Sequence, residues 1–172
     1  MKSDNENRLA LINILLYVIS KLGDGEFHKV FKILYFAEQE HIKRFGKRLL
    51  NDTYIAMKYG PVPSNSYDLL KSVRNGELGA YFLSVSEHRV RAVSEPDLDY
   101  LSESEVYCID NSIEQFGSLS FNERTDKSHD DAYNSVKLNQ PMDIFKIAAV
   151  GGASEDMVKY LTDHLEAKLL FN

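Results

Sequence analysis

Two short clusters in the chain contain side chains of the types that carry out acid–base or metal chemistry. Glu38 and His41 are three residues apart, so on a helix they share one face, where such a pair can bind a metal ion or exchange protons. Ser128, His129 and Asp130 have the side chains of a hydrolytic triad, but triad members converge from distant segments. We therefore interpret the first pair as a partly buried histidine held by a carboxylate, and the second cluster as local hydrogen bonding near a helix start.

The sequence lacks the other common motifs of metal and nucleotide sites. Its five histidines show no HExxH spacing and have no cysteine partners, so they predict no zinc site. No GxxxxGK[ST] or GxGxxG loop is available to hold phosphate groups. The single cysteine, Cys108, lies in an apolar helical pattern, which is typical of a small buried side chain rather than of a nucleophile. We therefore predict that the protein is not an enzyme and has no catalytic residues, no metal and no cofactor.

Length and composition are those of one globular domain. The chain has 172 residues, of which 44% are hydrophobic and 27% are charged. It starts with polar residues, and its first apolar run, Leu9–Ile19, is too short to span a membrane. We therefore predict a cytoplasmic protein that has no signal peptide and does not bind a membrane.

The negative charge is concentrated in the middle of the chain. The net charge is −6, but residues 94–131 alone contain 11 acidic and 2 basic residues, a net charge of −9. This segment argues against nucleic-acid binding, which needs clustered positive charge, and favours a basic protein partner; a solvated helix face is the alternative. The basic turn Lys43–Arg48 is the best nucleic-acid candidate, but no base-reading helix follows it, which favours a solvated helix end.

The elements that must position these side chains are mainly helical. Apolar residues occur on nearly every side of residues 9–22, which predicts a central, buried helix. A second helix over residues 27–45 has an apolar face, with Lys32 placed off that face. Gly46 is predicted to end this helix in a left-handed conformation.

A proline-rich corner follows the second helix. Residues 53–57 are compatible with either a strand or a helix. Pro61 and Pro63 exclude a regular helix at the corner, because proline lacks the backbone N–H and fixes φ. Ser64 is then the predicted N-cap of a helix over residues 65–74.

The chain contains one predicted antiparallel hairpin. Alternating residues pair Val85 with Val90 and Leu83 with Ala92, joined by the four-residue loop Ser86–Arg89. Because two strands alone are marginally stable, the hairpin must pack on helices.

The second half of the chain returns to helices. S-x-x-E capping boxes at Ser102 and Ser120 predict two helix starts. Ser154 is predicted to cap a last helix whose apolar residues, ending with Leu169, face inward. No linker or repeat interrupts the pattern, so residues 1–172 are predicted to form a single compact domain, mainly α (α+β), with a small antiparallel β-hairpin.

Several of these segments resemble those of a known family. The resemblance is carried by Lys32–His41 (KILYFAEQEH), Gly46, Asp52–Ala56 (DTYIA), Tyr59–Ser64 (YGPVPS), Tyr67–Leu70 (YDLL), Ser128-His129 and Ala132-Tyr133. They resemble the SocA-like, or Panacea, antitoxin domain of bacterial, phage and prophage toxin–antitoxin systems. The resemblance is strongest over residues 9–133, and residues 134–172 are predicted to add helices that pack on this part. Tyr133 stands where we expect tryptophan.

The resemblance implies an antitoxin that suppresses a cognate protein toxin, encoded by the adjacent gene, through direct contact. An adaptor that delivers the toxin to a cytoplasmic protease is the main alternative, and a DNA-binding regulator is a third. The acidic segment and the lack of a basic recognition helix weigh against DNA binding. Antitoxin and adaptor both bind a protein, and the sequence leaves this choice open.

Partner-binding residues are predicted in the corner and in the acidic segment. The corner either sets the angle between two elements or, with its flanking tyrosines, anchors a partner, because preordered aromatic residues lose little entropy on binding. The acidic helix is predicted to cover a basic surface of a toxin that acts on RNA or nucleotides. The predicted partner-binding residues are Tyr35, His41, Tyr59, Gly60, Pro61, Val62, Pro63, Tyr67, Glu103, Glu105, Glu114 and His129.

Overall fold

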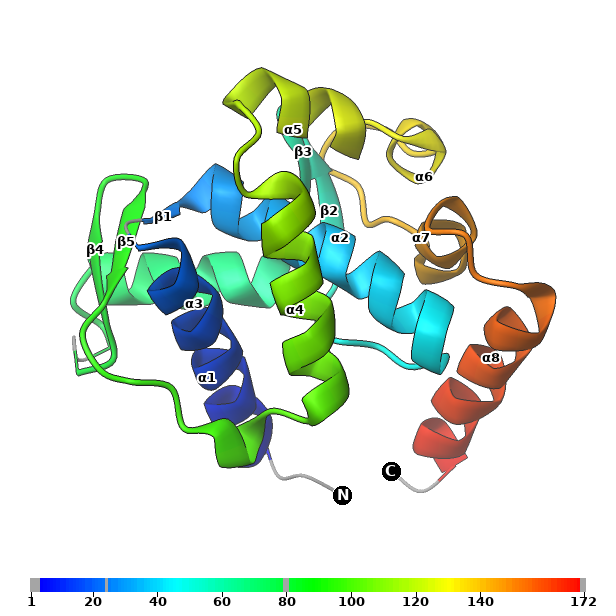
Figure 1. Ribbon diagram of the computed structural model, residues 1–172, viewed down its shortest axis with the longest axis horizontal. Coiled ribbons are helices and arrows are strands. Elements are labelled where there is room, and N and C mark those ends of the chain that lie inside the picture. The colour runs from blue at the N-terminus through cyan, green and yellow to red at the C-terminus, as the bar shows by residue number, and fades with distance from the viewer. Residues whose placement is uncertain (1–3, 24, 79–80, 171–172) are drawn as a thin grey trace.

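Helix α2 lies at the centre of the fold in the computed structural model, which describes residues 4–23, 25–78 and 81–170 (Figure 1). These residues form eight α-helices, one 3-10 helix and five strands. In chain order the elements are α1 (Asp4–Leu22), β1 (Gly25–Glu26), α2 (Phe27–Phe45), β2 (Tyr54–Met57), β3 (Gly60–Pro63), α3 (Ser64–Arg74), β4 (Leu83–Ser86), β5 (Arg89–Ala92), η1 (Leu98–Tyr100), α4 (Glu103–Phe116), α5 (Phe121–Ser128), α6 (Asp131–Asn134), α7 (Ile144–Val150) and α8 (Glu155–Leu170). The predicted helix-dominated α+β class is therefore confirmed.

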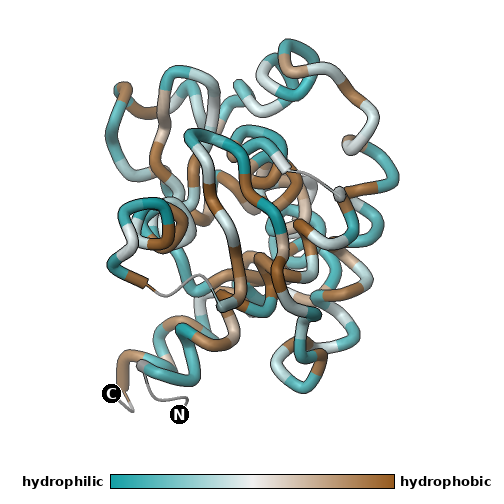
Figure 2. The backbone as a smooth tube through the Cα atoms, turned by 90° about the vertical axis from the view of Figure 1, so that its left-hand side faces the viewer, coloured by the Kyte–Doolittle hydropathy of each residue, from teal (hydrophilic) through white to brown (hydrophobic). Residues whose placement is uncertain are grey.

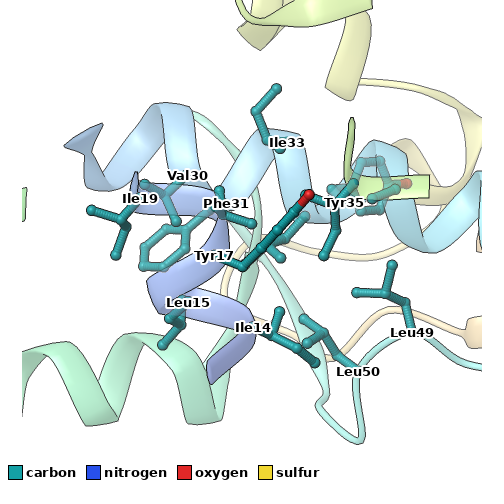
Figure 3. Close-up of a cluster of buried hydrophobic side chains, with 14 of the residues drawn as sticks. Ile14, Leu15, Tyr17, Ile19, Val30, Phe31, Ile33, Tyr35, Leu49 and Leu50 are labelled. Carbon is teal, nitrogen blue, oxygen red and sulfur yellow. The ribbon is translucent and has the colours of Figure 1, made fainter. Parts of the chain in front are cut away.

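The hydrophobic core forms where α1 and the segment after α2 meet α2. Figure 3 shows these buried side chains: Ile14, Leu15, Tyr17 and Ile19 of α1, Val30, Phe31, Ile33 and Tyr35 of α2, and Leu49 and Leu50 after it. Helix α4 packs along a further side of α2 (Figure 1). In Figure 2, hydrophobic and hydrophilic residues alternate along the backbone. The prediction of a buried first helix is thus confirmed. Within the described ranges, none of the helices is both long and apolar enough to cross a membrane.

The predicted hairpin is formed by β4 and β5. Val85 pairs with Val90 and Leu83 with Ala92, as predicted from the alternation. The loop is shorter than the predicted four residues. Ser86 pairs with Arg89, so these two residues belong to the strands and only residues 87–88 form the turn. Strand β1 pairs with the other side of β5, so the hairpin becomes a three-stranded sheet in the order β1-β5-β4.

Residues 53–57, which the sequence left open between strand and helix, provide strand β2. It pairs with β3, and residues 139–142 hydrogen-bond to its opposite side, for example through Met142 N–H to Tyr54 O at 2.8 Å. Strand β3 therefore lies at an edge of this sheet. An edge strand tolerates Pro61 and Pro63, because neither residue has an N–H to donate to a further strand.

The predicted signals at helix ends are largely confirmed. The capping boxes at Ser102 and Ser120 both form, and Gly46 ends α2 with a left-handed φ of 61°. The prediction for the last helix is wrong in part: Leu161 is buried, but Leu169 is 77% exposed, because the end of α8 extends beyond the core that holds Leu161.

The prediction that Ser64 caps α3 is wrong, because Ser64 is already the first helical residue. The cap comes instead from the buried carboxylate of Asp52. It accepts hydrogen bonds from Asn65 N–H at 2.8 Å and from Ser66 N–H at 2.9 Å. A negative charge at this position also interacts favourably with the positive end of the helix dipole.

A second buried carboxylate, Glu38, fixes the segment between α2 and β2. It accepts the backbone N–H groups of Leu49 at 3.1 Å and Leu50 at 3.0 Å, and its Oε1 lies 3.3 Å from Arg48 Nε. The guanidinium of Arg48 also donates to the carbonyl of Asp52. Together Glu38 and Asp52 therefore hold the chain between α2 and α3.

We predict that Glu38→Ala lowers the free energy of unfolding by about 3 kcal/mol or more, because it leaves the partly buried guanidinium of Arg48 and two buried N–H groups without their acceptor. Urea unfolding followed by circular dichroism measures this. The control is Glu40→Ala, which removes a partly exposed i, i+4 ion pair with Arg44 and should cost about 0.5 kcal/mol or less. Similar losses in both variants would contradict the role assigned to Glu38.

Candidate functional site

The turn between β2 and β3 packs directly against α2 and α5. Gly60 has φ 103°, and a Cβ atom there would lie 2.4 Å from Ser128 Oγ and 2.6 Å from Lys32 Cε. Only glycine fits this conformation and this close approach. The predicted corner is therefore fixed by contacts to two helices as well as by its prolines.

A pocket of about 500 Å³ opens beside this turn. It is lined by the start of α2, the β2–β3 turn, α3, the β4–β5 turn and the start of α5, through residues that include Phe27, Phe31, Val62, Tyr67 and Phe121. The Tyr67 ring meets those of Phe27 and Phe31 edge to face, with centroids 6.2 Å and 5.9 Å away. Pockets of this size with apolar walls are typical of sites that take an apolar group.

Lys32 provides a polar group at the wall of this pocket. Its side chain is 1% exposed, and its Nζ donates a hydrogen bond to the carbonyl of Pro61 at 2.9 Å. Burial, reinforced by the positive charge of Arg124, lowers the pKa of this amine to about 7. The prediction that Lys32 lies off the buried face of its helix is wrong, because the β2–β3 turn covers this side of α2.

Three further basic side chains surround Lys32. His28 hydrogen-bonds Thr125 Oγ1 at 2.9 Å, and its pKa is lowered to about 3 by burial, then by the charges of Lys32 and Arg124. His129 stacks on Tyr133, with ring centroids 4.1 Å apart. The pKa of His129 is lowered mainly by burial and also by the charge of Lys32. The site thus combines weakly basic imidazoles with a buried amine and a buried guanidinium. Among the residues that the structure describes, no three His, Cys, Asp or Glu side chains are grouped to hold a metal ion.

The predicted corner residues differ from one another in their exposure to solvent. Tyr59 is 49% exposed and, with Val62 and Tyr67, lines the pocket. Gly60 also lines it, although the residue is buried, while Pro61 and Pro63 are buried in β3. The corner therefore sets the position of the turn and also presents aromatic side chains.

The other predicted residues lie outside this pocket. Tyr35 is buried and donates to Asp130, whose carboxylate caps α6 by accepting Tyr133 N–H, so the predicted local bonding at Asp130 is confirmed. Glu103 and Glu114 are exposed on α4. The Glu105 carboxylate accepts a hydrogen bond from the Ser102 backbone N–H in the capping box.

His41 is not held by Glu38, contrary to the prediction. Its ring contacts the carbonyl of Lys47 at 2.8 Å and the hydroxyl of Ser104 at 3.1 Å. The shared helical face does not bring the two side chains together, because Glu38 turns toward the backbone after Arg48.

Sequence reasoning missed Lys32, His28, Arg124 and Phe121 as members of the site. One available signal was Lys32 itself, a single cation between the strongly apolar residues 30–31 and 33–37. The contributions of Arg124 and Phe121 depend on how α5 folds back onto α2, which no local pattern reports.

We predict that Lys32→Met stabilises the protein near neutral pH and that this gain disappears at high pH. Between pH 7 and 10.5 the unfolded chain binds the Lys32 proton and the folded protein does not, so wild-type stability rises with pH in this window. The advantage of the variant should shrink by up to about 1.4 kcal/mol per pH unit. Urea unfolding at pH 7, 8, 9 and 10 measures it, and exposed Lys43→Met is the control. If the difference in unfolding free energy between Lys32→Met and the wild type stays constant from pH 7 to 10, the Lys32 amine is not neutral in the folded protein.

Comparisons with known proteins identify the family of the chain. A family model described as Antitoxin SocA-like, Panacea domain, matches residues 30–133, which include Lys32, the β2–β3 turn, α5 and His129. No curated protein and no solved structure matches the chain significantly. The family match covers more than half of the chain and confirms the resemblance of its sequence segments. The chain therefore belongs to the SocA-like antitoxin family and contains its Panacea domain.

Proposed function

We propose that this antitoxin-family protein neutralises a cognate toxin by binding it directly, with the aromatic pocket beside the β2–β3 turn as the contact surface. The observation that carries this proposal is the pocket itself, which presents partly exposed aromatic side chains from fixed backbone. Tyr59 stacks edge to face on Phe121 with centroids 5.3 Å apart, and Lys58 Nζ lies 5.0 Å from the Tyr59 ring centroid. Preordered aromatic side chains of this kind are typical centres of protein interfaces.

In this proposal the toxin is the product of the adjacent gene and the protein acts in the cytoplasm without catalysis. Neutralisation by binding leaves the toxin present but inactive. An adaptor would instead cause protease-dependent loss of the toxin. Following toxin abundance by immunoblot during co-expression separates the two, and loss of toxin that stops in protease-deficient cells would replace direct neutralisation with delivery.

We predict that Tyr59→Ala weakens binding of the toxin by about 30-fold, because truncating a central aromatic anchor costs about 2 kcal/mol. Isothermal titration calorimetry with the product of the adjacent gene measures the affinity, and growth rescue measures neutralisation. Tyr160→Ala is the matched control, since Tyr160 is 50% exposed on α8 and lies outside the lining of the pocket. Equal affinities of both variants and the wild type would contradict the role of the pocket.

The acidic face of α4 is proposed as a second, electrostatic contribution. Glu103 and Glu114 are exposed on the same helix, eleven residues apart and thus on the same side of it. Their charges can steer a toxin whose own surface is basic because its substrate is anionic.

We predict that reversing Glu103 and Glu114 to lysine slows association with the toxin several-fold at low salt and has little effect at high salt, where charges are screened. Stopped-flow association at several salt concentrations measures this. Reversal of Glu155 and Asp156 on α8 is a control with the same change in net charge. If both double variants slow association equally, the effect belongs to net charge and not to the face of α4.

A further inference from the structure

Two cations lie close together inside the protein, and neither has an ion-pair partner among the residues that the structure describes. Lys32 is 1% and Arg124 4% exposed, and the charge of Arg124 acts directly on Lys32. Glu26 and Glu123 influence Arg124 from a distance, but no carboxylate in residues 4–23, 25–78 and 81–170 forms an ion pair with either cation. Buried charges are costly unless they are paired, so this arrangement favours an anion supplied from outside.

The same side chains have unused hydrogen-bonding capacity. An ammonium group has three donors, and within the described part of the chain Lys32 uses one of them, to the carbonyl of Pro61. Arg124 donates to the carbonyl of Leu119, but its buried Nε has no hydrogen-bond partner in the described chain. The buried Nε2 of His129 also lacks a partner there. Native proteins normally satisfy such atoms, and both side chains interact electrostatically with Lys32, so these unpaired groups favour a ligand near it.

Lys32 lies where this polar site meets the apolar pocket. The pocket is lined by Lys32 itself together with aromatic and aliphatic side chains, and it has room for a large apolar group. We propose that the site binds a carboxylate of the toxin on the amine of Lys32, with the apolar side chain next to that carboxylate in the pocket. This inference rests on the proposed function and adds the chemical class of the group that is recognised.

The rim of the pocket favours a single carboxylate over a polyanion. Glu26, Glu87, Lys58 and Arg89 line the pocket. Glu26 Oε1 lies 3.7 Å from Arg89 Nη1. A nucleic-acid backbone would meet these carboxylates as well as the cations, whereas a short segment with one carboxylate reaches Lys32 between them. The field of Arg124 strengthens this attraction without direct contact.

The test uses a pair of small probes that differ only in charge. N-acetyl-L-phenylalanine carries an aromatic side chain beside a carboxylate, and N-acetyl-L-phenylalaninamide carries the same side chain beside a neutral amide. Titration of each into the ¹⁵N-labelled protein at pH 6, followed through the amide shifts of pocket residues, gives both affinities. We expect the acid to bind about tenfold more tightly than the amide, because a charge-assisted hydrogen bond is stronger than a neutral one.

Two variants remove the charge in different ways. Lys32→Met loses the amine, and Lys32→Gln keeps a donor for Pro61 O but carries no charge. Both should bind the two probes with equal affinity, whereas exposed Lys43→Met should keep the tenfold preference. The fold of each variant is checked by its amide spectrum, and the second variant serves if the first does not fold.

Several results would overturn the inference. They are equal binding of both probes to the wild type, binding of neither, a preference that survives in both Lys32 variants, or tighter binding of phenyl phosphate than of the acid. These outcomes do not depend on the toxin, so they are distinct from failure of the proposed function, which neutralisation and calorimetry with the toxin report separately.

Discussion

Helix α2 is covered by protein along most of its length, so its two buried charged side chains, Lys32 and Glu38, must find partners inside the fold. Glu38 and Lys32 meet this constraint in the same way, by bonding to the backbone of a neighbouring segment. Glu38 thereby holds the chain that leads from α2 to β2, and Lys32 holds the turn between β2 and β3. The position of the pocket depends on both, because its walls are the helix and that turn.

The two buried charges differ in how completely they are satisfied. Glu38 accepts two backbone N–H groups and faces a guanidinium, which balances its charge within the fold. Lys32 has one carbonyl acceptor and a second cation near it. We therefore interpret Glu38 as a structural group and Lys32 as the group through which the fold meets a ligand, since perturbed titratable groups in clefts are typical of functional sites.

Local signals predicted much of the fold, while the site depends on contacts that such signals do not contain. The capping boxes at Ser102 and Ser120 were predictable because both partners lie within four residues. The cap of α3 was not, because Asp52 precedes β2 and is brought to the start of α3 only by the pairing of β2 with β3. Helical periodicity likewise placed Lys32 on an outer face, since it cannot report that a later turn and α5 cover that face. The pocket gathers five segments, and no spacing in the sequence brings them together.

A purely structural explanation of Lys32 accounts for only part of what is observed. A hydrogen bond to the carbonyl of Pro61 would fix the turn, but one neutral donor is enough for that purpose. An amine adds a charge that must be desolvated next to Arg124, which lowers stability without improving the hydrogen bond. Proteins commonly accept such a cost where a binding site requires it. A charge that binds an incoming carboxylate explains why an amine, and not a neutral group of similar length, stands between the turn and the pocket.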